Sequence, residues 1–439
     1  MKNKITLTIF TFLGLVSFGF AQTERSVTLK EAVDLSIANS KQLKLSKARI
    51  SEALASQREA EDRKLPDASA QAAYLRLTSA NVDIKNRNPN SSGSTEQPNV
   101  NQAAYGIINI SLPLYAGGRI RYGIESSKLL VKAAELDAEN DQQSIIENTI
   151  ASYTNLFKAR LALDLVKENL GQAQQRVTEL SSLERNGLLA RNDLLKAELQ
   201  ASNTELTSVD VENNWKLANL NMNILLGLPD STTLRLDSGF LQQAVNLQPV
   251  SNYTQTALND RKDVASVELR RQAAEVGVKS IRAERLPSIA LTGGYVAADI
   301  PRVLTVTNAA NIGVGVSYSV GNLWKNKARV EGANARVQQL EANQELLNDN
   351  IRVQVNRAYL NVISQQKKID VYAKAVEQAN ENYRITNNKF KNNLETTSNL
   401  LEADVSRLQS QLNYQFGKAD ALVAYYQLLL AAGQLNSVK

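Results

Sequence analysis

The stretch SLPLYAGGRIRYGIESSKLLVKAAE, Ser111–Glu135, joins two different sequence patterns. Up to the glycines, apolar residues alternate with small or polar ones, as in GIINISLPL, which predicts a strand with one apolar face. Beyond them no proline occurs as far as Glu184, and helix-forming residues predominate. The pair Gly117 and Gly118 permits a sharp backbone bend between the two parts. The sequence therefore predicts a strand that turns directly into a very long helix.

The same order of features occurs twice in the chain, which predicts two structural repeats. SYTNLFKARLALDLV, beginning at Ser152, shares its apolar spacing with AYLNVISQQKKIDVY, beginning at Ala358, at a shift of 206 residues. RKLPDASAQAAY, ending at Tyr74, matches ERLPSIALTGGY, ending at Tyr295, at a shift of 221. The difference of 15 residues falls in a polar segment rich in Asn, Ser, Gly and Pro, typical of an exposed loop. We expect residues 86–99 of this loop to face the cell exterior.

The N-terminal stretch MKNKITLTIFTFLGLVSFGFA has two lysines, an apolar run and small residues at its end. This pattern predicts a cleaved signal peptide over residues 1–21, and the absence of cysteine there argues against a lipid anchor. Each repeat is predicted to contain a helix, two strands, a long helix and a return helix. The first repeat, 22–228, has strands 69–80 and 103–116 and helices at about 119–184 and 191–226. After a linker at 229–252, the second repeat, 253–439, has strands 288–299 and 307–320 and helices at about 325–390 and 397–432.

The composition limits the chemistry that the chain can perform. It has no cysteine and no histidine, which removes disulfides, thiol nucleophiles, imidazole bases and the usual zinc ligands. No carboxylate pair stands out from the charges spaced for ion pairs along helices. The 50 basic and 44 acidic residues are interspersed, and export does not suit a nucleic-acid partner. We therefore expect no catalytic residues, no metal, no cofactor and no nucleic acid.

The strands set a condition on assembly. No segment after the signal peptide has the ~18 consecutive apolar residues of a membrane-spanning helix, so a membrane crossing would use strands. An apolar outer face and a small or polar inner face are the pattern of a membrane barrel. Four strands cannot close, because the smallest such barrels use about eight. A dimer would supply eight strands and a trimer twelve around a lumen, and the sequence favours the trimer.

Both predicted long helices carry an apolar stripe. Its residues recur at steps of three and four, the spacing of coiled-coil seams. The stripes consist of Leu163, Val166, Leu170, Ala173, Val177 and Leu180 in the first helix, and of Ile369, Tyr372, Val376, Ala379, Tyr383 and Thr386 in the second. Such stripes indicate helix packing, and packing is itself a function where the helices enclose a tube.

These patterns resemble the TolC-like outer membrane efflux family, the trimeric exit ducts of bacterial drug pumps and type I secretion systems. The resemblance covers nearly all of the mature chain. It rests on SLPLYAGGRIRYGIESSKLLVKAAE at the strand-to-helix junction, LERNGLLARNDLLKAE at the periplasmic tip, and the twofold repeat. It implies a mainly α fold with a twelve-stranded outer membrane β-barrel, a twelve-helix periplasmic tunnel and an equatorial belt, formed by a homotrimer. A periplasmic adaptor and an inner-membrane pump are the implied partners.

The strand-to-helix junction is predicted to lie at the membrane surface, beside outer membrane lipids. Its aromatic and basic side chains suit the headgroup region, and its glycines suit the bend. The second repeat has SVGNLWKNK at the same level, without the proline and with one glycine fewer. The predicted junction residues are Tyr115, Gly117, Gly118, Arg119, Arg121, Trp324, Lys325 and Lys327.

The two turns between a long helix and its return helix are predicted to be the periplasmic tips. The first long helix ends at Gly187, which suits a left-handed cap, and Asn192 or Asp193 is expected to cap the next helix. In the second turn Asn393 replaces the glycine, because Asn tolerates positive φ. Exposed leucines in a polar turn suggest a partner, which the resemblance identifies as the adaptor. The predicted docking residues are Gly187, Leu188, Asn192, Asp193, Leu194, Asn393, Leu394, Ser398 and Leu400.

The second tip is also predicted, by resemblance, to narrow the tunnel. The family's best-known members have two acidic residues there, and Asn399 and Glu402 occupy those positions in this chain. A trimer would therefore present one ring of three carboxylates rather than two.

The same patterns leave two alternative functions, a periplasmic adaptor and a secreted enzyme. A periplasmic adaptor would have one long helical hairpin, whereas this chain has two hairpins, each preceded by a strand pair. A secreted enzyme on a helical scaffold would have to work with Glu, Asp, Tyr, Ser or Lys alone.

Overall fold

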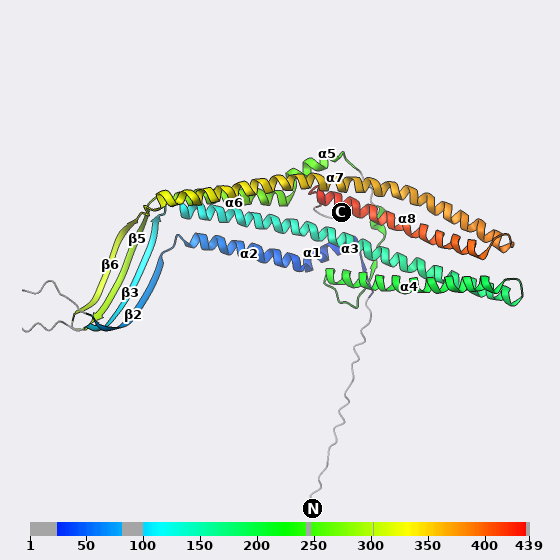
Figure 1. Cartoon of the computed structure of the whole chain (residues 1–439), viewed down its shortest axis with the longest axis horizontal. Coiled ribbons are helices and arrows are strands. Elements are labelled where there is room, and N and C mark those ends of the chain that lie inside the picture. The colour runs from blue at the N-terminus through cyan, green and yellow to red at the C-terminus, as the bar shows by residue number, and fades with distance from the viewer. Residues whose placement is uncertain (1–23, 81–99, 243–246, 302, 436–439) are drawn as a thin grey trace, which may run out of the picture.

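The computed structural model describes residues 24–80, 100–242, 247–301 and 303–435. The predicted signal peptide and the predicted exterior loop at 86–99 lie outside these ranges. The molecule is long and narrow, with a curved sheet at one end and two helical hairpins reaching the other (Figure 1).

The two repeats contain the same elements in the same order. The first consists of α1 (Leu29–Asn39), α2 (Lys41–Asp62), β2 (Asp67–Ala80), β3 (Val100–Tyr115), α3 (Arg119–Arg185) and α4 (Arg191–Leu226). The second consists of α5 (Val250–Asp260), α6 (Lys262–Ala283), β5 (Ser288–Ile300), β6 (Leu304–Ser317), α7 (Asn322–Lys391) and α8 (Thr397–Ala431). The sequence repeat is thus also a structural repeat.

The end of the second strand pair differs from the predicted bounds. β6 ends at Ser317 instead of 320, and α7 begins at Asn322 instead of 325. The N–H of Asn322 donates to the carbonyl of Ser319 at 2.9 Å, and the N–H of Leu323 donates to that of Val320 at 3.0 Å. These turn hydrogen bonds start the helix early and take residues 318–320 out of the strand.

The four long strands form one antiparallel sheet in the order β2-β3-β5-β6. Every second side chain of β6 projects from one face of the sheet, and among these Ile312 is 81% exposed. Val314 and Val316 of β6 and Ile108 and Ile110 of β3 are also exposed. In the described part of the chain, β2 pairs only with β3 and β6 only with β5. The sheet therefore has two free edges and bare apolar side chains.

The helices pack side by side along the length of the molecule. α3 and α4 form one hairpin and α7 and α8 form the other, while α2 and α6 lie between the middle and the sheet (Figure 1). α3 is central and packs against α2, α4, α6 and α8. Its predicted stripe is buried at Leu163, Val166, Ala173 and Leu180. Within the described ranges no helix is both long enough and apolar enough to cross a bilayer.

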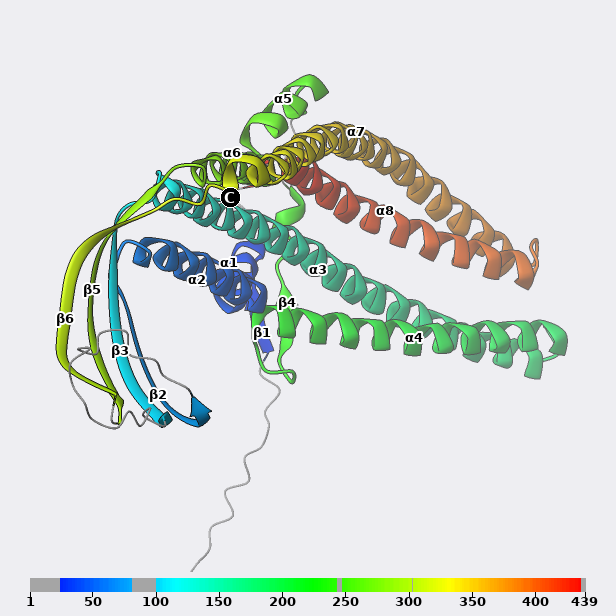
Figure 2. The same ribbon diagram turned by 60° about the vertical axis from the view of Figure 1, so that its left-hand side comes forward.

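A belt of short elements crosses the middle of the molecule. β1 (Glu24–Val27) pairs in parallel with β4 (Thr233–Leu236), and a 3₁₀ helix, Gly239–Gln242, follows. The sequence predicts neither strand, because four residues are too few for an alternation to stand out. The pairing places the start of the described chain beside the linker between the repeats (Figure 2).

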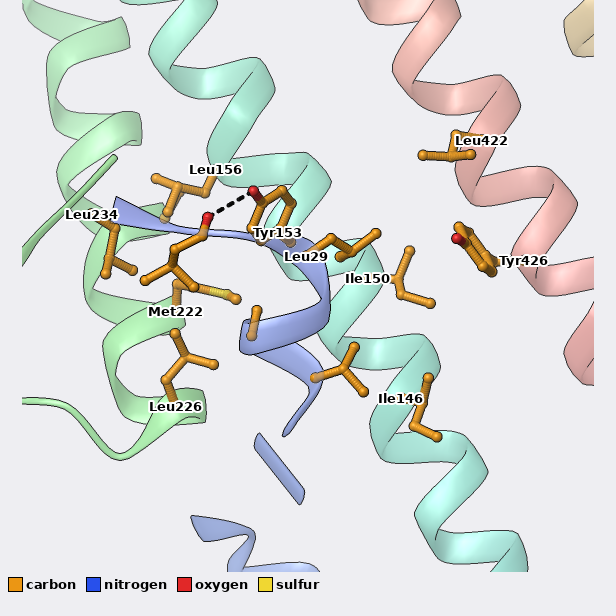
Figure 3. Close-up of a cluster of buried hydrophobic side chains, with 14 of the residues drawn as sticks. Leu29, Ile146, Ile150, Tyr153, Leu156, Met222, Leu226, Leu234, Leu422 and Tyr426 are labelled. Atoms are coloured by element: carbon orange, nitrogen blue, oxygen red, sulfur yellow. Dashed lines mark hydrogen bonds between the residues drawn. The ribbon is translucent and has the colours of Figure 1, made fainter. Parts of the chain in front are cut away.

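A large buried cluster holds this belt together. It joins α1, α3, α4, β4 and α8 around Tyr153 (Figure 3). The hydroxyl of Tyr153 donates to the carbonyl of Val27 at 2.9 Å and accepts from the N–H of Asp237 at 3.1 Å. Burial raises the pKa of Tyr153, so the hydroxyl stays protonated as a donor. Because α8 contributes Leu422 and Tyr426, the cluster fastens the second hairpin to the first.

Candidate functional sites at the hairpin tips and the sheet end

Both hairpin tips use the same helix ending. After α3, Gly187 has a φ of +72°, the N–H of Leu188 donates to the carbonyl of Leu183 and that of Gly187 to Glu184, each at 2.9 Å. This is a complete Schellman motif. After α7 the same bonds form at equivalent positions, with Asn393 at a φ of +56° in place of the glycine. The left-handed conformations predicted for Gly187 and Asn393 are confirmed.

The tip leucines divide into exposed and buried ones. Leu188 is 72% exposed and Leu394, its counterpart in the second repeat, is 74% exposed. Leu194 and Leu400 are each 1% exposed, and Leu194 packs against Leu180. The prediction that Leu194 and Leu400 offer a docking surface is therefore corrected. They fall one turn inside their helices, on the face that closes the hairpin, and hold the turn in shape.

The helix starts at the two tips differ. α4 begins at Arg191 with Ala190 as its N-cap and no capping side chain, so the prediction that Asn192 or Asp193 caps it is wrong. Asp193 instead lies in the first turn, paired with Lys196 at 3.3 Å. A carboxylate there is favourable because it faces the positive end of the helix dipole. At α8 the hydroxyl of Thr396 accepts from the N–H of Asn399 at 3.2 Å.

The predicted constriction residues lie at the start of α8. Asn399 and Glu402 are both exposed, and the amide of Asn399 donates to the carboxylate of Glu395 at 2.6 Å. Glu395 also accepts from the N–H of Thr396, and these two hydrogen bonds lower its pKa. Sequence reasoning missed this second carboxylate. The spacing of Glu395, Asn399 and Glu402, at steps of four and three, is the signal that finds it.

A buried ionic cluster connects the two hairpins near the tips, and sequence reasoning missed it too. Asp404 of α8 accepts from Arg176 of α3 at 3.0 Å and from Arg407 at 2.8 Å. Arg176 also donates to the hydroxyl of Tyr383 in α7 at 3.0 Å, and the guanidinium of Arg407 lies over the Tyr383 ring, 3.9 Å from its centre. Arg407 reaches back to Gln172 of α3 at 2.6 Å. Asp404 thus binds two arginines, from α3 and α8, and both arginines contact Tyr383 of α7.

At the sheet end, the bend predicted at the glycine pair is present. Gly117 and Gly118 have φ values of +64° and +88°. A Cβ on Gly117 would lie 2.7 Å from the carbonyl oxygen of Ala283 and 2.8 Å from Cβ of Leu286. The turn from β3 to α3 therefore packs directly on the turn from α6 to β5. Glycine is required here both by backbone conformation and by space.

Aromatic and basic side chains surround this bend, as the sequence predicts. Tyr115, the last residue of β3, is 46% exposed, and Trp324, in the first turn of α7, is 63% exposed. Arg119, Arg121, Lys325 and Lys327 are also exposed, and Arg121 lies over the ring of Tyr122 at 5.6 Å. Among the described residues, no group of three or more acidic side chains is arranged to hold a metal ion.

Comparison with known proteins divides the chain at the same place as the structural repeat. The model of the family described as "Outer membrane efflux protein" matches residues 32–228 and 253–434, the two repeats on either side of the linker. The chain belongs to the outer membrane efflux protein family. This is a family of channel-forming proteins and not of enzymes. The efflux protein resides in the outer membrane with its helices in the periplasm, and it serves as the exit duct of an efflux system.

Individual relatives are distant in sequence. The efflux protein is 22% identical over 333 residues to the outer membrane efflux protein BepC of Brucella suis, covering 75% of this chain and 72% of BepC. It is 28% identical over 248 residues to the cation efflux system protein CusC of Escherichia coli K12, covering 54% and 52%. The fold is similar to a solved CusC structure, with a TM-score of 0.76, 19% identity and 92% of both chains covered. The Campylobacter jejuni channel CmeC gives a TM-score of 0.74 at 20% identity, covering 99% and 93%.

Proposed function

We propose that three copies of this efflux protein close their sheets into one twelve-stranded barrel and their helices into one twelve-helix tunnel. The free edges of the sheet carry this proposal, since β2 and β6 each have one partner in the described chain. An open edge is not stable in lipid, because its N–H and C=O groups have no partner there. Three identical sheets joined edge to edge have no open edge, and the exposed side chains around Ile312 then face lipid.

The junction is the proposed contact with outer membrane lipids. Tyr115 ends β3 and Trp324 lies in the first turn of α7, where each exposed aromatic ring would span the boundary between lipid chains and headgroups. Arg119, Arg121, Lys325 and Lys327 follow directly and would reach phosphate groups on the periplasmic side. The bend at Gly117 and Gly118 redirects the chain from the tilted strand into the helix at this level.

The two tips are the proposed docking site for a periplasmic adaptor, which links the duct to an inner-membrane pump. Leu188 and Leu394 support this, because two large apolar side chains at equivalent turn positions are nearly bare. Of the other predicted docking residues, Gly187, Asn192, Asn393 and Ser398 are exposed and Asp193 is half-exposed. Asn399 and Glu402 line the proposed constriction, with Glu395 beside them. The system served is a tripartite efflux pump or a type I secretion system.

Mass measurement on detergent-extracted protein tests the assembly. We expect three chains per particle and a barrel that migrates differently before and after heating. A monodisperse monomer would overturn the proposal. For docking, a photo-crosslinking residue at Leu188 or Leu394 should capture a co-expressed periplasmic adaptor, whereas one at Lys327, near the start of α7 at the other end of the molecule, should not. Equal capture from all three positions would contradict docking at the tips.

A further inference from the structure

A pocket opens where the end of α8 meets the start of α6, alongside the middle of α7 (Figure 1). Its walls come from α3, from the joint between α5 and α6, from α7 and from the last turns of α8. Its volume is about 730 Å³, within the range of about 300–1,000 Å³ of pockets that hold small organic ligands. Because it lies near the middle of the 70-residue α7, it is about 50 Å from both the tips and the sheet.

One guanidinium, that of Arg261, holds the walls of this pocket together. Its Nε and Nη2 donate to the two carboxylate oxygens of Asp263 at 3.1 and 2.7 Å. Its Nη1 donates to the carbonyl of Ala431 in α8 and to Oε1 of Gln354 in α7, each at 3.1 Å. Arg261 thus connects the α5–α6 joint to both helices of the second hairpin.

A second guanidinium in the lining, that of Arg357, is not used in this way. Among the described residues the exposed Arg357 side chain forms no hydrogen bond and no ion pair. Two amides beside it also have N–H groups to offer. The oxygen of Gln354 is taken by Arg261 and that of Asn361 accepts from Gln365 at 3.4 Å, which leaves the amide nitrogens of Gln354 and Asn361 as donors.

The carboxylates around the pocket are already engaged. Asp263 is the acidic residue of the described lining, and both of its oxygens accept from Arg261. Glu147 of α3 lies outside the lining and accepts from the amide of Gln427 at 3.2 Å. Two arginines and one aspartate leave the lining with a net charge of +1. The pocket therefore presents donors and positive charge, which suit an anion.

The helical framework itself does not require these arginines. The equivalent of Arg357 in the first repeat, at the shift of 206, is Ala151. The equivalent of Arg261, at the shift of 221, is Ser40, whose hydroxyl caps α2 by accepting from the N–H of Leu43 at 3.1 Å. The same elements form in both repeats, so the unpaired charge of Arg357 has no counterpart that the fold depends on.

We infer that this pocket binds small amphipathic organic anions, with an apolar body and one carboxylate. The guanidinium of Arg357 pairs with the carboxylate, and the amides of Gln354 and Asn361 are further donors to it. Leu360 and Leu430 line the same pocket and contact the apolar body. Inorganic phosphate fits less well, because it carries more charge than one free arginine balances and gains nothing from the leucines. This binding does not depend on docking at the tips.

Protection of a reporter thiol tests the site in the full-length protein, because the chain has no cysteine of its own. Ser144→Cys places the thiol in the lining, where the neutral reagent N-ethylmaleimide should modify it. We expect 4-phenylbutyrate at pH 7 to slow this reaction. The uncharged 4-phenylbutan-1-ol, which has the same apolar body, should need at least about fivefold more for the same protection, because it cannot form a charge-assisted hydrogen bond.

Two further variants assign the protection to Arg357. Added to the reporter, Arg357→Gln should raise the 4-phenylbutyrate concentration for half protection about fivefold or more. Arg352→Gln is the matched control, because Arg352 is an exposed arginine of α7 that contacts Asp349 and does not line the pocket. It should leave this concentration unchanged. A control thiol from Ser51→Cys, on α2, should not be protected, although the Ser51 hydroxyl makes the same bond to the preceding helical turn as that of Ser144.

Several outcomes would overturn the site. They are an absence of protection at about 10 mM 4-phenylbutyrate, equal protection by the alcohol, and an equal loss of protection in Arg352→Gln and Arg357→Gln. A Ser144→Cys thiol that reacts only after unfolding would also contradict it, because the pocket would then be closed. The mass of each variant is measured first. A mass of one chain would count against the proposed trimer, and the protection data would still decide whether the pocket binds the anion.

Discussion

Arg176 in α3 and Asp404 in α8 form an ion pair that crosses from one hairpin to the other, with side chains only 11% and 7% exposed. Elsewhere the hairpins meet through the apolar cluster around Tyr153, to which α8 contributes Leu422 and Tyr426, and through partly exposed polar contacts such as Lys158 with Asp420. Removing water from a charged pair is costly, so such a pair is stable only while both partners stay in place. The ionic cluster around Asp404 therefore also fastens the second hairpin to the first, near the proposed tunnel mouth.

Replacing Asp404 with Asn should loosen this connection. Arg176 and Arg407 would remain, 11% and 19% exposed, without the carboxylate that both contact. Breaking a buried pair in this way costs about 3–5 kcal/mol. We expect a lower midpoint of thermal unfolding and a larger single-channel conductance in planar bilayers. Asp193→Asn is the matched control, because its pair with Lys196 is exposed and contributes at most ~1 kcal/mol. Equal effects from both variants would exclude a special role for Asp404.

Acid should weaken the contact of α6 with its neighbours through Glu268. A hydrogen bond from Arg271 lowers the pKa of this carboxyl to about 2, and Arg271 also lies 3.8 Å from Glu341 of α7. Because the folded pKa lies below the unfolded one of ~4.3, this stabilisation is full above pH 4.3 and is lost as pH falls towards 2. Thermal unfolding between pH 6 and pH 2.5 should show a smaller loss for Glu268→Gln than for the natural chain. Parallel curves would contradict it.

Gly417 of α8 should not tolerate a methyl group. A Cβ there would lie 2.8 Å from Cδ2 of Tyr372, whose ring fills the space between α7 and α8. Overpacking of this kind costs about 1–3 kcal/mol, more than the ~1 kcal/mol that alanine gains over glycine in a helix. Gly417→Ala should therefore lower the unfolding temperature. Gly171→Ala, with nothing within 4 Å of its Cβ in the protomer, should raise it or leave it unchanged.

The second tip turn should become more stable when Asn393 is replaced by glycine, the residue that the first tip has at Gly187. Asn393 adopts a φ of +56°, which is unfavourable for any residue with a Cβ. Asn393→Gly should raise the free energy of unfolding by up to about 0.5 kcal/mol, and Asn393→Ala should lower it by about 1 kcal/mol. Chemical denaturation of the assembled protein measures both. If alanine proves as good as glycine, the Schellman geometry does not limit stability at this turn.

Patterns of regular spacing reveal the fold because each long element repeats its period many times. The predicted return helix 191–226 coincides with α4, and the shift of 221 relates α2 to α6 at both ends. A single position at which the two repeats differ is harder to interpret than a periodic pattern. Asn393 was identifiable because Asn is one of few residues that accept positive φ.

The parts that sequence reasoning missed have no period to detect. β1 and β4 have four residues each, and they are held by pairing between segments about two hundred residues apart. Ala190 caps α4 without a side-chain oxygen, so no polar residue marks the true start. Asp404 looks like any charged residue on an amphipathic helix, and only the approach of α3 buries it. Leu194 and Leu188 are both leucines of one turn, and the direction of each side chain decides which is exposed.

The tunnel mouth provides the last prediction. Glu402 is exposed near the start of α8, and the carboxylate of Glu395 is held beside Asn399 at 2.6 Å. In a trimer these side chains would bring three or six carboxylates around one axis, where they attract cations and repel one another. Glu402→Gln should reduce block by divalent cations in planar bilayers and lower the preference for cations, and the double variant with Glu395→Gln should lower both further. Glu179→Gln is the control, because Glu179 is an exposed residue of the α3 shaft that contacts Gln175. If the double variant assembles as a trimer and keeps both the selectivity and the divalent block of the natural protein, the constriction does not lie at the start of α8.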